Sequence, residues 1–435
     1  MIVHDMEAIG RVYDTIRNGG RVITDSREVR EGDLFVALKG ENHNGNHYVG
    51  QALQQGACFA IVDEAAAVLD ERCLLLPDAL VFLQRLAWFH RRRLAIPILA
   101  ITGTNGKTTT KELCHAVLSR KFRTTATKGN FNNHIGVPLT LLSMDSSTEF
   151  GIVEMGANHP GEIKALCQIA GPNYGIITNV GYAHLEGFGS YENIARTKGE
   201  LYDYIIQHDG TLFINNPDSV LDRLAGEYPR VTYGRTGCFA NGKPLQAAPY
   251  LVCDLDTTKG HLYIKTKLVG GYNFDNVMAA SAVGLHFQID PLEIQAAIEA
   301  YTPSNLRSQW LQTKNNAILL DTYNANPSSM QVALDNFAAM KGENKLLIIG
   351  EMLELGASSL QAHADLLEKI EQLNLTSVFL IGQSFAPWIN KYTFATYFDH
   401  TDKLIDYLKQ HKIHSSLILV KGSRGNRLER IIDEL

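Results

Sequence analysis

Ile98-Leu99-Ala100-Ile101-Thr102-Gly103-Thr104-Asn105-Gly106-Lys107-Thr108-Thr109-Thr110 is the stretch of this sequence that decides the fold. Its first residues form a short apolar run that predicts a buried parallel strand, and two glycines then break the strand. Residues 111–118 place apolar side chains at helical spacing. A strand, a glycine turn and a helix N-terminus together make a cradle for phosphate, because backbone N–H groups and the helix dipole both favour an anion.

The polar residues of this loop indicate which ligand it holds. Lys107 would reach the outer phosphates of ATP, and the Thr108 hydroxyl would ligate Mg²⁺. The strict phosphate-loop pattern has a glycine at the position of Ile101, so this loop is a Gly-x-x-Gly-Lys-Thr variant. A chance glycine turn before a core helix is the less favoured alternative. The predicted nucleotide contacts are Gly103, Thr104, Asn105, Gly106, Lys107, Thr108 and Thr109.

Two later strands end in groups that could serve the same ligand. The predicted strand 149–153 is followed by Glu154, and the predicted strand 175–180 is followed after a short turn by His184. Because the carboxyl ends of parallel strands meet at one edge of a sheet, we expect both side chains beside the Lys107 loop. Glu154 is a candidate Mg²⁺ ligand or water-positioning group, and a solvent-facing carboxylate is the alternative. For His184, a structural role is the alternative.

The length of the chain and its alternation of predicted strands and helices predict three α/β units. With 435 residues the chain exceeds one ordinary domain. We expect a mixed α/β unit at residues 1–96, a central phosphate-loop unit with a parallel sheet at 97–304, and a Rossmann-like α/β unit at 305–435. The breaker Thr302-Pro303-Ser304 marks the second boundary.

Composition argues against several classes of protein. Apolar residues make up 45% of the chain and the net charge is −6, which disfavours a nucleic-acid partner. The cluster Arg91-Arg92-Arg93 is therefore interpreted as a solvated helix end. Six scattered cysteines without a C-x-x-C pair favour reduced thiols. The start of the chain lacks the pattern of a signal peptide, and no apolar run is long enough for a membrane span, so we expect a soluble, cytoplasmic protein.

The first unit carries two polar stretches that suit a phosphate and a sugar. Thr24, Asp25, Ser26 and Arg27 combine hydroxyls, a carboxylate and a guanidinium. The glycine-containing loop at 39–47, which includes Asn44, Asn46 and His47, could form a binding rim. On composition alone, a plain surface loop is the stronger interpretation of that segment.

Several long stretches, in order and over nearly the whole chain, resemble the Mur ligase family of ATP-dependent amide-bond ligases. The phosphate loop is one of them. The others are Gly129-Asn130-Phe131-Asn132-Asn133-His134-Ile135-Gly136-Val137-Pro138, Gly181-Tyr182-Ala183-His184-Leu185-Glu186-Gly187-Phe188-Gly189, Asp321-Thr322-Tyr323-Asn324-Ala325-Asn326-Pro327-Ser328-Ser329-Met330, Gly350-Glu351-Met352-Leu353-Glu354-Leu355-Gly356 and Lys421-Gly422-Ser423-Arg424.

The resemblance implies roles for individual residues. Thr108 and Glu154 would bind one Mg²⁺, His184 would bind a second, and Lys198 matches a lysine that CO₂ converts to a carbamate ligand. By the same resemblance Lys107, Glu154, His184 and Lys198 form the catalytic set. Nucleotide contacts would also come from Asn273, Arg307, Asp321, Tyr323, Asn324 and Asn326. Substrate contacts would come from Thr24, Asp25, Ser26, Arg27, Asn44, Asn46, His47, Asn132, Asn133, Lys421 and Arg424, and for the last two a role as surface charges is an equal alternative.

The resemblance also implies the reaction. The matches favour the family member that joins D-alanyl-D-alanine to UDP-N-acetylmuramoyl-tripeptide through an acyl phosphate, with ATP and Mg²⁺, as a monomer. The last unit is then expected to swing and close over ATP. Alternatives are the ligase that adds the third stem residue, although its Asp-Asn-Pro-Arg motif is absent, and folylpolyglutamate synthase, which has little chain before its loop. A small-molecule kinase and a regulatory GTPase also remain open, although the guanine motif Asn-Lys-x-Asp is missing.

Overall fold

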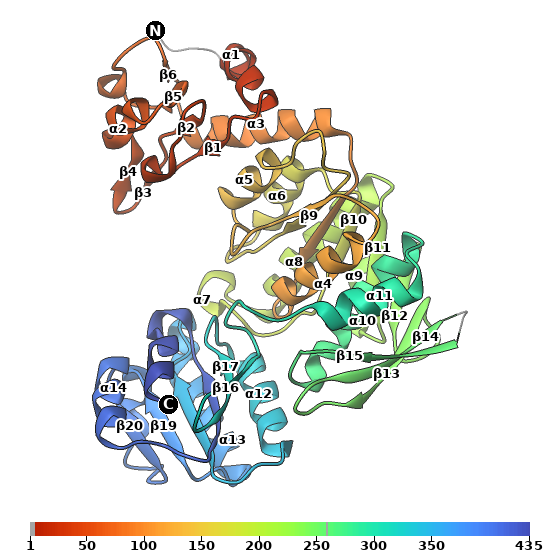
Figure 1. Ribbon diagram of the computed structural model, residues 1–435, viewed down its shortest axis with the longest axis vertical. Helices are drawn as coiled ribbons and strands as arrows, with labels where there is room; N and C mark the ends of the chain where they lie inside the picture. The colour runs from red at the N-terminus through yellow and green to blue at the C-terminus, as the bar shows by residue number, and fades with distance from the viewer. Residues whose placement is uncertain (1–4, 258–259) are drawn as a thin grey trace.

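The computed structural model describes residues 5–257 and 260–435. Residues Met1 to His4, which bear on the expected absence of a signal peptide, lie outside the described residues. The described residues form three main sheets, which follow one another along the long axis of the molecule, and one two-stranded sheet (Figure 1). This arrangement confirms the predicted α/β class with three units. The exact boundaries near residues 96 and 304 stay predictions.

The first sheet is small and entirely parallel. Its order is β1 (Val22–Ile23), β2 (Leu34–Val36), β5 (Phe59–Val62) and β6 (Cys73–Leu75). A two-stranded antiparallel hairpin, β3 (Lys39–Gly40) and β4 (His43–Asn44), projects from it. The helices of this unit are α1 (Asp5–Arg17), α2 (Val49–Gln54) and the long α3 (Ala79–Leu94), which packs against both the first and the second sheet.

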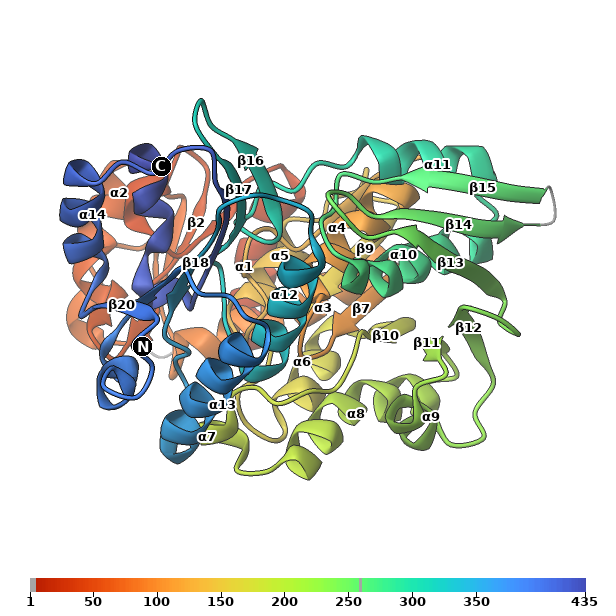
Figure 2. The same ribbon diagram turned by 90° about the horizontal axis from the view of Figure 1, so that it is seen from below.

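The central sheet is the largest and carries the phosphate loop. Its strands β8, β9, β7, β10, β11, β12 and β13 run parallel, and a β13–β14–β15 antiparallel extension completes it on the side away from β8 (Figure 2). The strands are β7 (Ile98–Thr102), β8 (Thr124–Ala126), β9 (Phe150–Glu154), β10 (Tyr174–Ile177), β11 (Thr211–Asn216), β12 (Arg230–Gly234), β13 (Ala240–Gln246), β14 (Val252–Thr257) and β15 (Gly260–Lys265).

Helices cover both faces of this sheet, and strand β7 shows why its sequence is continuously apolar. Leu99 and Ile101 pack on one side with α4 (Lys107–Leu118), α10 (Phe274–His286) and α11 (Pro291–Ala300). Ile98 and Ala100 pack on the other side with α3, α5 (Gly136–Leu142), α6 (Glu162–Ala170) and α8 (Tyr191–Gln207). A strand buried on both faces needs apolar residues at every position. Two short helices, α7 (Leu185–Phe188) and α9 (Ser219–Ala225), complete this unit.

The third sheet is parallel except for one edge strand. Its order is β16 (Gln309–Gln312), β17 (Ala317–Asp321), β21 (Leu417–Lys421), β18 (Lys345–Gly350), β19 (Val378–Ile381) and β20 (Ala395–Phe398). Its helices are α12 (Pro327–Ala339), α13 (Ser359–Gln372) and α14 (Thr401–Gln410). Short 3₁₀ turns lie at η1 (Ser26–Glu28), η2 (Gly45–Tyr48), η3 (Ala65–Ala67), η4 (Gly271–Asn273), η5 (Gly356–Ser358), η6 (Gln383–Trp388), η7 (Arg424–Asn426) and η8 (Leu428–Glu434).

One expectation about the surface is wrong. Arg91 is not part of a solvated helix end, because it is buried and joins α3 to the C-terminal end of α6. Its Nε donates to Ala170 O at 2.8 Å and its Nη2 to Gly171 O at 2.9 Å. Arg92 and Arg93 are solvent-accessible and lie over aromatic rings of their own helix. Along residues 5–257 and 260–435, no helix combines the length and apolarity needed to cross a membrane.

Candidate active site

A cavity of about 1150 Å³ lies where the three units meet, at the carboxyl ends of the central strands. The register of the sheet explains why polar groups gather there, because Ile101 pairs with Glu154 and Thr102 pairs with Ile177. Most of the predicted site residues line this cavity: Gly103, Thr104, Asn105, Gly106, Lys107, Thr109, Asn132, Asn133, Glu154, His184, Lys198, Asn273, Arg307, Asp321, Tyr323, Asn324, Asn326, Lys421 and Arg424.

The phosphate loop requires its two glycines. Gly103 has a φ of +140°, and a Cβ there would lie 2.0 Å from the Thr178 hydroxyl oxygen. Gly106 has a φ of +81°, and its Cβ would lie 2.5 Å from Asn276 Oδ1. Both positions therefore combine left-handed backbone with a close approach that only glycine tolerates. The α4 helix then begins at Lys107, as predicted.

Lys107 closes this loop. Its Nζ donates to Gly103 O at 2.7 Å and to Thr104 O at 3.0 Å. Burial lowers the pKa of Lys107 to about 8, a shift that the nearby Glu154 carboxylate opposes and the Arg307 charge reinforces. The ammonium is thus held among carbonyl oxygens at the mouth of the loop, where phosphate oxygens would compete for it.

At the end of β9, one carboxylate oxygen of Glu154 accepts two hydrogen bonds. Oε1 accepts from Asn132 Nδ2 at 2.9 Å and from the Thr108 hydroxyl at 3.3 Å. The other oxygen, Oε2, is buried and has no hydrogen-bond partner, and Lys111 Nζ lies 4.0 Å from it. Glu154 is 1% exposed, so the alternative of a carboxylate facing solvent is wrong.

Lys198 projects from α8 into the same cavity and is 3% exposed. The pKa of Lys198 is lowered to about 7 by burial first and by the charge of Lys107 second, whereas Glu162 and Glu200 act in the opposite direction. Its Nζ lies 5.6 Å from the centre of the Phe188 ring. A buried lysine with this pKa is in large part a neutral amine near pH 7.

His184 joins the central unit to the third unit. It lies in left-handed backbone with a φ of +50°. Its Nδ1 is 2.6 Å from Oε2 of Glu354, which precedes η5 of the third unit. The histidine bond is the largest cause that lowers the pKa of the Glu354 carboxyl. Whether His184 also binds a metal, as predicted, stays a prediction.

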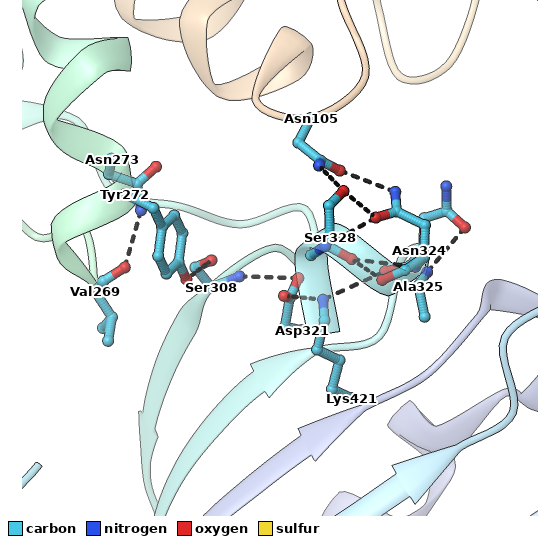
Figure 3. A network of polar contacts seen from close by, with 12 residues as sticks. Asn105, Val269, Tyr272, Asn273, Ser308, Asp321, Asn324, Ala325, Ser328 and Lys421 are labelled. Carbon is cyan, nitrogen blue, oxygen red and sulfur yellow. Dashed lines mark hydrogen bonds and ion pairs between the residues drawn. The ribbon is translucent and has the colours of Figure 1, made fainter. Parts of the chain in front are cut away.

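A second contact between the units lies on the phosphate loop itself. Asn105 Nδ2 donates to the Ser328 hydroxyl at 2.9 Å, and Asn326 Nδ2 donates to Asn105 Oδ1 at 2.9 Å (Figure 3). Asn326 also caps α12, because its Oδ1 accepts from Ser329 N at 2.8 Å. The predicted nucleotide contact of Asn326 is untested, and in this structure its side chain links the loop to α12.

The remaining predicted nucleotide contacts line the same cavity. The Arg307 guanidinium stacks on Tyr323 at 3.9 Å, and its Nε is buried without a hydrogen-bond partner. Asn273 Nδ2 donates to Val269 O at 2.9 Å (Figure 3). Asn324 Oδ1 accepts from Ala325 N at 2.9 Å and shapes the turn after β17. A planar cation stacked on a tyrosine beside an unpaired N–H suits a nucleotide phosphate or base.

The two basic residues suggested for a dipeptide carboxylate differ in their surroundings. Lys421 is 2% exposed and forms an ion pair with Asp321, the neighbouring strand end (Figure 3). Arg424 is exposed and donates to Glu429 Oε1 at 2.9 Å. The alternative that Lys421 is a surface charge is therefore wrong, whereas binding of a dipeptide by either residue stays a prediction.

The predicted sugar-binding residues of the first unit do not line the cavity. Asp25 binds Arg27 at 2.6 Å, and that hydrogen bond is the main cause that lowers the pKa of Asp25 to about 2. Ser26 Oγ donates to Gln51 Oε1 at 3.0 Å. Thr24 is half-buried and His47 is exposed.

The asparagines of the predicted sugar loop largely bond within the protein. Asn44 Oδ1 accepts from Asn46 N at 3.0 Å, and Asn46 Nδ2 donates to Asp63 Oδ1 at 2.7 Å. In the central unit, Asn133 Oδ1 accepts from Gly136 N at 2.9 Å and starts α5, while Asn132 holds Glu154. Their contacts with a substrate stay predictions.

The structure adds polar residues that the sequence analysis did not single out. They are Lys111, Thr178, Asn179, Asn276, Ser328 and Glu354. Asn179 Oδ1 accepts from Asn105 N at 3.0 Å, and the Thr178 hydroxyl donates to Asn105 O at 2.6 Å, so the end of β10 holds the phosphate loop. Ser328 and Glu354 stood inside the quoted motifs, and Lys111 lies one helical turn after Lys107, so each of these three had a signal in the sequence.

Three family models match successive stretches of the chain. Residues 21–82 match the Mur ligase family catalytic domain, residues 101–284 match the Mur ligase middle domain, and residues 306–424 match the Mur ligase glutamate ligase domain.

Curated relatives and solved structures match nearly the full length. The UDP-N-acetylmuramoyl-tripeptide–D-alanyl-D-alanine ligase of Bacillus subtilis is 33% identical over 95% of this chain and 92% of the relative. The enzyme of that name from Escherichia coli is 30% identical over 95% of this chain and 93% of the relative. A crystal structure of MurF from Acinetobacter baumannii superposes with a TM-score of 0.86 at 31% identity. The match covers 95% of this chain and 93% of that chain. MurF ligase from Thermotoga maritima in complex with ADP gives 0.84 at 28% identity, covering 97% of each chain.

Proposed function

The chain belongs to the Mur ligase family, and from that premise we propose that it is the ATP-dependent ligase that joins D-alanyl-D-alanine to UDP-N-acetylmuramoyl-tripeptide. The observation that carries the proposal is the single cavity that brings the phosphate loop, Glu154 and Lys198 together. The curated relatives named for this reaction match along nearly the whole chain, which favours this substrate pair over those of other ligases. The product belongs to the cytoplasmic stage of peptidoglycan synthesis.

The reaction has two steps. The terminal carboxylate of the tripeptide attacks the γ-phosphorus of ATP, the bond to the β-phosphate oxygen breaks, and ADP leaves. The amine of D-alanyl-D-alanine then attacks the acyl carbon, the bond to the phosphate oxygen breaks, and the nitrogen loses its proton as the amide forms. No side chain needs to act as a nucleophile, so the task of the protein is to position anions and to neutralise their charge.

Residues of the cavity supply that neutralisation. Lys107 and the N-terminus of α4 would bind the phosphates, and the Arg307 guanidinium, with its unpaired Nε, would add a second positive charge in the same cavity. The close approach of Asn326 and Ser328 to Asn105 places the third unit over the loop. Such a cover would exclude water from the acyl phosphate.

Magnesium fits the residues that surround the loop. Glu154 Oε1 and the Thr108 hydroxyl lie 3.3 Å apart and are the hard oxygen donors that Mg²⁺ prefers. Among the described residues, no three His, Cys, Asp or Glu side chains are grouped to hold a metal by themselves. We therefore assign Thr108 and Glu154 to one Mg²⁺, and His184 with Lys198 to a second, completed by phosphate oxygens. Bound Mg²⁺ would neutralise the charge of the reacting phosphates.

Lys198 suits modification by CO₂. A carbamate forms when a neutral amine nitrogen bonds the carbon of CO₂ and releases one proton. The low pKa of Lys198 provides that neutral amine near pH 7, and its burial shields the product from water. The modified side chain would carry two anionic oxygens that can bind a divalent cation, whereas an ammonium would repel it.

Phosphate release from ATP tests the proposal directly. The protein is incubated with Mg²⁺ and UDP-N-acetylmuramoyl-tripeptide, together with D-alanyl-D-alanine, with single amino acids, or alone. We expect turnover only with the dipeptide, and a UDP-pentapeptide product by mass spectrometry. Turnover with a diamino acid and a UDP-dipeptide would instead identify the ligase of the third stem residue. A stable phosphorylated product without an amide would identify a kinase.

The first variant to measure is Lys107→Met. Without the ammonium at the mouth of the loop, we expect phosphate release to fall at least about a hundredfold, the size of effect typical for one charge-stabilising donor. Lys121→Met, at an exposed lysine beyond the end of the same helix, is the matched control. If both Lys107→Met and Lys121→Met keep the wild-type rate of phosphate release, the loop does not bind the reacting phosphate.

A further inference from the structure

Lys111 is a buried charge that the mechanism above does not use. It lies on α4 one turn after Lys107, and its side chain has no exposed surface. Its Nζ donates to Thr127 O at 2.6 Å and lies 2.9 Å from Glu112 Oε1. A lysine is almost never fully buried without a specific electrostatic partner. Glu112 alone does not explain the position, because a pair between adjacent helix residues could form at the surface.

The second partner of Lys111 is the carboxylate of Glu154. Glu154 Oε2 is buried without any hydrogen bond, and Lys111 Nζ, at 4.0 Å, is the cation that faces it. A buried carboxylate oxygen with neither a donor nor a counter-charge is costly, so this cation compensates for the missing hydrogen bond.

One residue connects the two partners. The Thr127 hydroxyl accepts from Glu154 N at 3.0 Å, and the carbonyl of the same residue accepts from Lys111 Nζ. Thr127 follows β8, the strand beside β9, and is itself buried. The backbone of Glu154 and the ammonium of Lys111 are therefore both hydrogen-bonded to Thr127.

The two carboxylate oxygens of Glu154 have partners of different kinds. Oε1 accepts hydrogen bonds from two neutral donors, Asn132 Nδ2 and the hydroxyl of Thr108 in the first turn of α4. Oε2 has no hydrogen-bond partner and lies 4.0 Å from the Lys111 ammonium. The arrangement fixes which oxygen stands beside Thr108, where the proposed Mg²⁺ would bind.

We propose that Lys111 is a positioning residue for the reaction, and that it holds the Glu154 carboxylate so that Oε1 stays beside Thr108 to bind Mg²⁺. This inference rests on the proposed function for the identity of the ion. The coupling between Lys111 and Glu154 is a property of the chain itself and is tested separately. Residues that orient a metal ligand typically change metal affinity or activity by about 10–100-fold when they are removed.

The test compares Lys111→Met, Glu154→Gln and the double variant, with Lys121→Met as the control. Mn²⁺ binding is measured by electron paramagnetic resonance on the full-length protein with ADP. We expect Lys111→Met to weaken Mn²⁺ binding about tenfold. The double variant should bind no more weakly than Glu154→Gln alone, because both substitutions act on one ligand. Unchanged or tighter binding in Lys111→Met overturns the proposal.

Thermal unfolding without any metal gives a readout that is independent of activity. Lys111→Met leaves the buried Oε2 of Glu154 without the cation that faces it, so the unfolding midpoint should fall by about 4 °C or more. In the double variant Glu154 is neutral as well, and part of that loss should be recovered. If the two losses simply add, Lys111 does not act through Glu154. If Lys111→Met does not fold, a folded double variant still supports the pairing, and an unfolded one overturns it.

Steady-state kinetics separate positioning from a general loss of structure. In Lys111→Met the apparent KM for Mg²⁺ should rise about tenfold while the KM for D-alanyl-D-alanine stays unchanged. An equal loss in every parameter contradicts a positioning role. If the wild-type protein shows no ligase activity at all, the proposed function fails, and the Mn²⁺ and unfolding measurements still decide the role of Lys111.

Discussion

At the scale of single residues, the same side chain type has different roles in different surroundings. Lys107, Lys111 and Lys198 are all lysines of the central unit, and none of the three reaches open solvent freely. Lys107 is held by loop carbonyls, Lys111 faces a carboxylate, and Lys198 has a pKa near neutrality because burial disfavours its charged form. The surroundings of each lysine therefore determine which role its amine has.

The pKa of Lys198 predicts a pH-dependent requirement for CO₂. With a pKa of about 7, the neutral amine predominates above that pH and the ammonium predominates below it. The carbamate should therefore form at pH 8 and decline as the pH falls through about 7. Carbon NMR with ¹³C-bicarbonate measures it as a carbamate signal. The signal should be absent in Lys198→Ala and unaffected by Lys164→Ala, at an exposed lysine.

Activity should follow the same modification. Enzyme depleted of bicarbonate should lose most of its phosphate release at pH 6.5 and recover it when bicarbonate is added at pH 8. Lys198→Ala should be at least about a hundredfold slower at either pH, since a metal ligand is lost. Full activity of Lys198→Ala would contradict the assignment.

At the scale of elements, strand ends and helix starts carry the chemistry. The loop before α4 is shaped by two glycines and held by the end of β10, and α12 starts with a capping box made by Asn326 and Ser329. In the third unit, the segment after β18 is held by α13. There, His363 Nε2 accepts from Met352 N at 3.0 Å, and Nδ1 donates to Ser359 O at 2.7 Å. Because this segment carries Glu354, its order bears on the contact with His184.

His363 makes the stability of the third unit sensitive to pH. Burial lowers the pKa of His363 below its usual value near 6.5, although the Ser359 carbonyl and Glu351 act in the opposite direction. The folded protein therefore prefers the neutral ring. This contribution is fully present above pH 6.5 and is lost as the pH falls, because the unfolded chain then binds the proton first.

The matching variant is His363→Leu. It leaves the Met352 N–H without its acceptor, so the free energy of unfolding should fall by about 1–3 kcal/mol at pH 8. Between pH 7.5 and pH 5.5 the variant should lose less stability than the wild type. Urea unfolding at several pH values measures both effects, and His414→Leu, at an exposed histidine, is the control. Identical pH slopes in wild type and variant would show that His363 does not carry the effect.

At the scale of the whole molecule, two of the contacts between the third unit and the central unit lie beside the cavity. Asn326 and Ser328 bind the phosphate loop, and Glu354 binds His184. Both contacts join residues more than a hundred positions apart in the chain. They would have to adjust when the third unit moves over bound ATP, which stays a prediction.

Glu354→Gln tests the second contact. Both side chains of this contact are partly exposed, so its contribution is about 1 kcal/mol or less. A loss of that size changes the ratio of closed to open arrangements by about fivefold at most. Single-molecule fluorescence transfer between the central and third units should show a larger open population in Glu354→Gln without ligands. Glu368→Gln, on the exposed face of α13, is the control. An unchanged distribution would show that the contact does not hold the units together.

The fold class, the phosphate loop and many of the polar residues that line the cavity could be predicted from the sequence. Those features rest on local rules: an apolar strand, two glycines, a helix start and polar groups just after parallel strands. Such patterns are written in consecutive residues, so they can be found without knowing where distant parts of the chain lie. The family motifs extended the prediction to the third unit, including Arg307 and Tyr323.

Only the tertiary structure decided which polar groups bind each other. Asn132 and Lys111 are far from Glu154 in sequence, and their contacts with its carboxylate follow from the order of β7, β8 and β9. The pairing of His184 with Glu354 and the burial of Arg91 likewise depend on how units pack. Hydrogen bonds and pKa values depend on atoms within a few ångströms, and the fold brings those atoms together from positions that no local pattern connects.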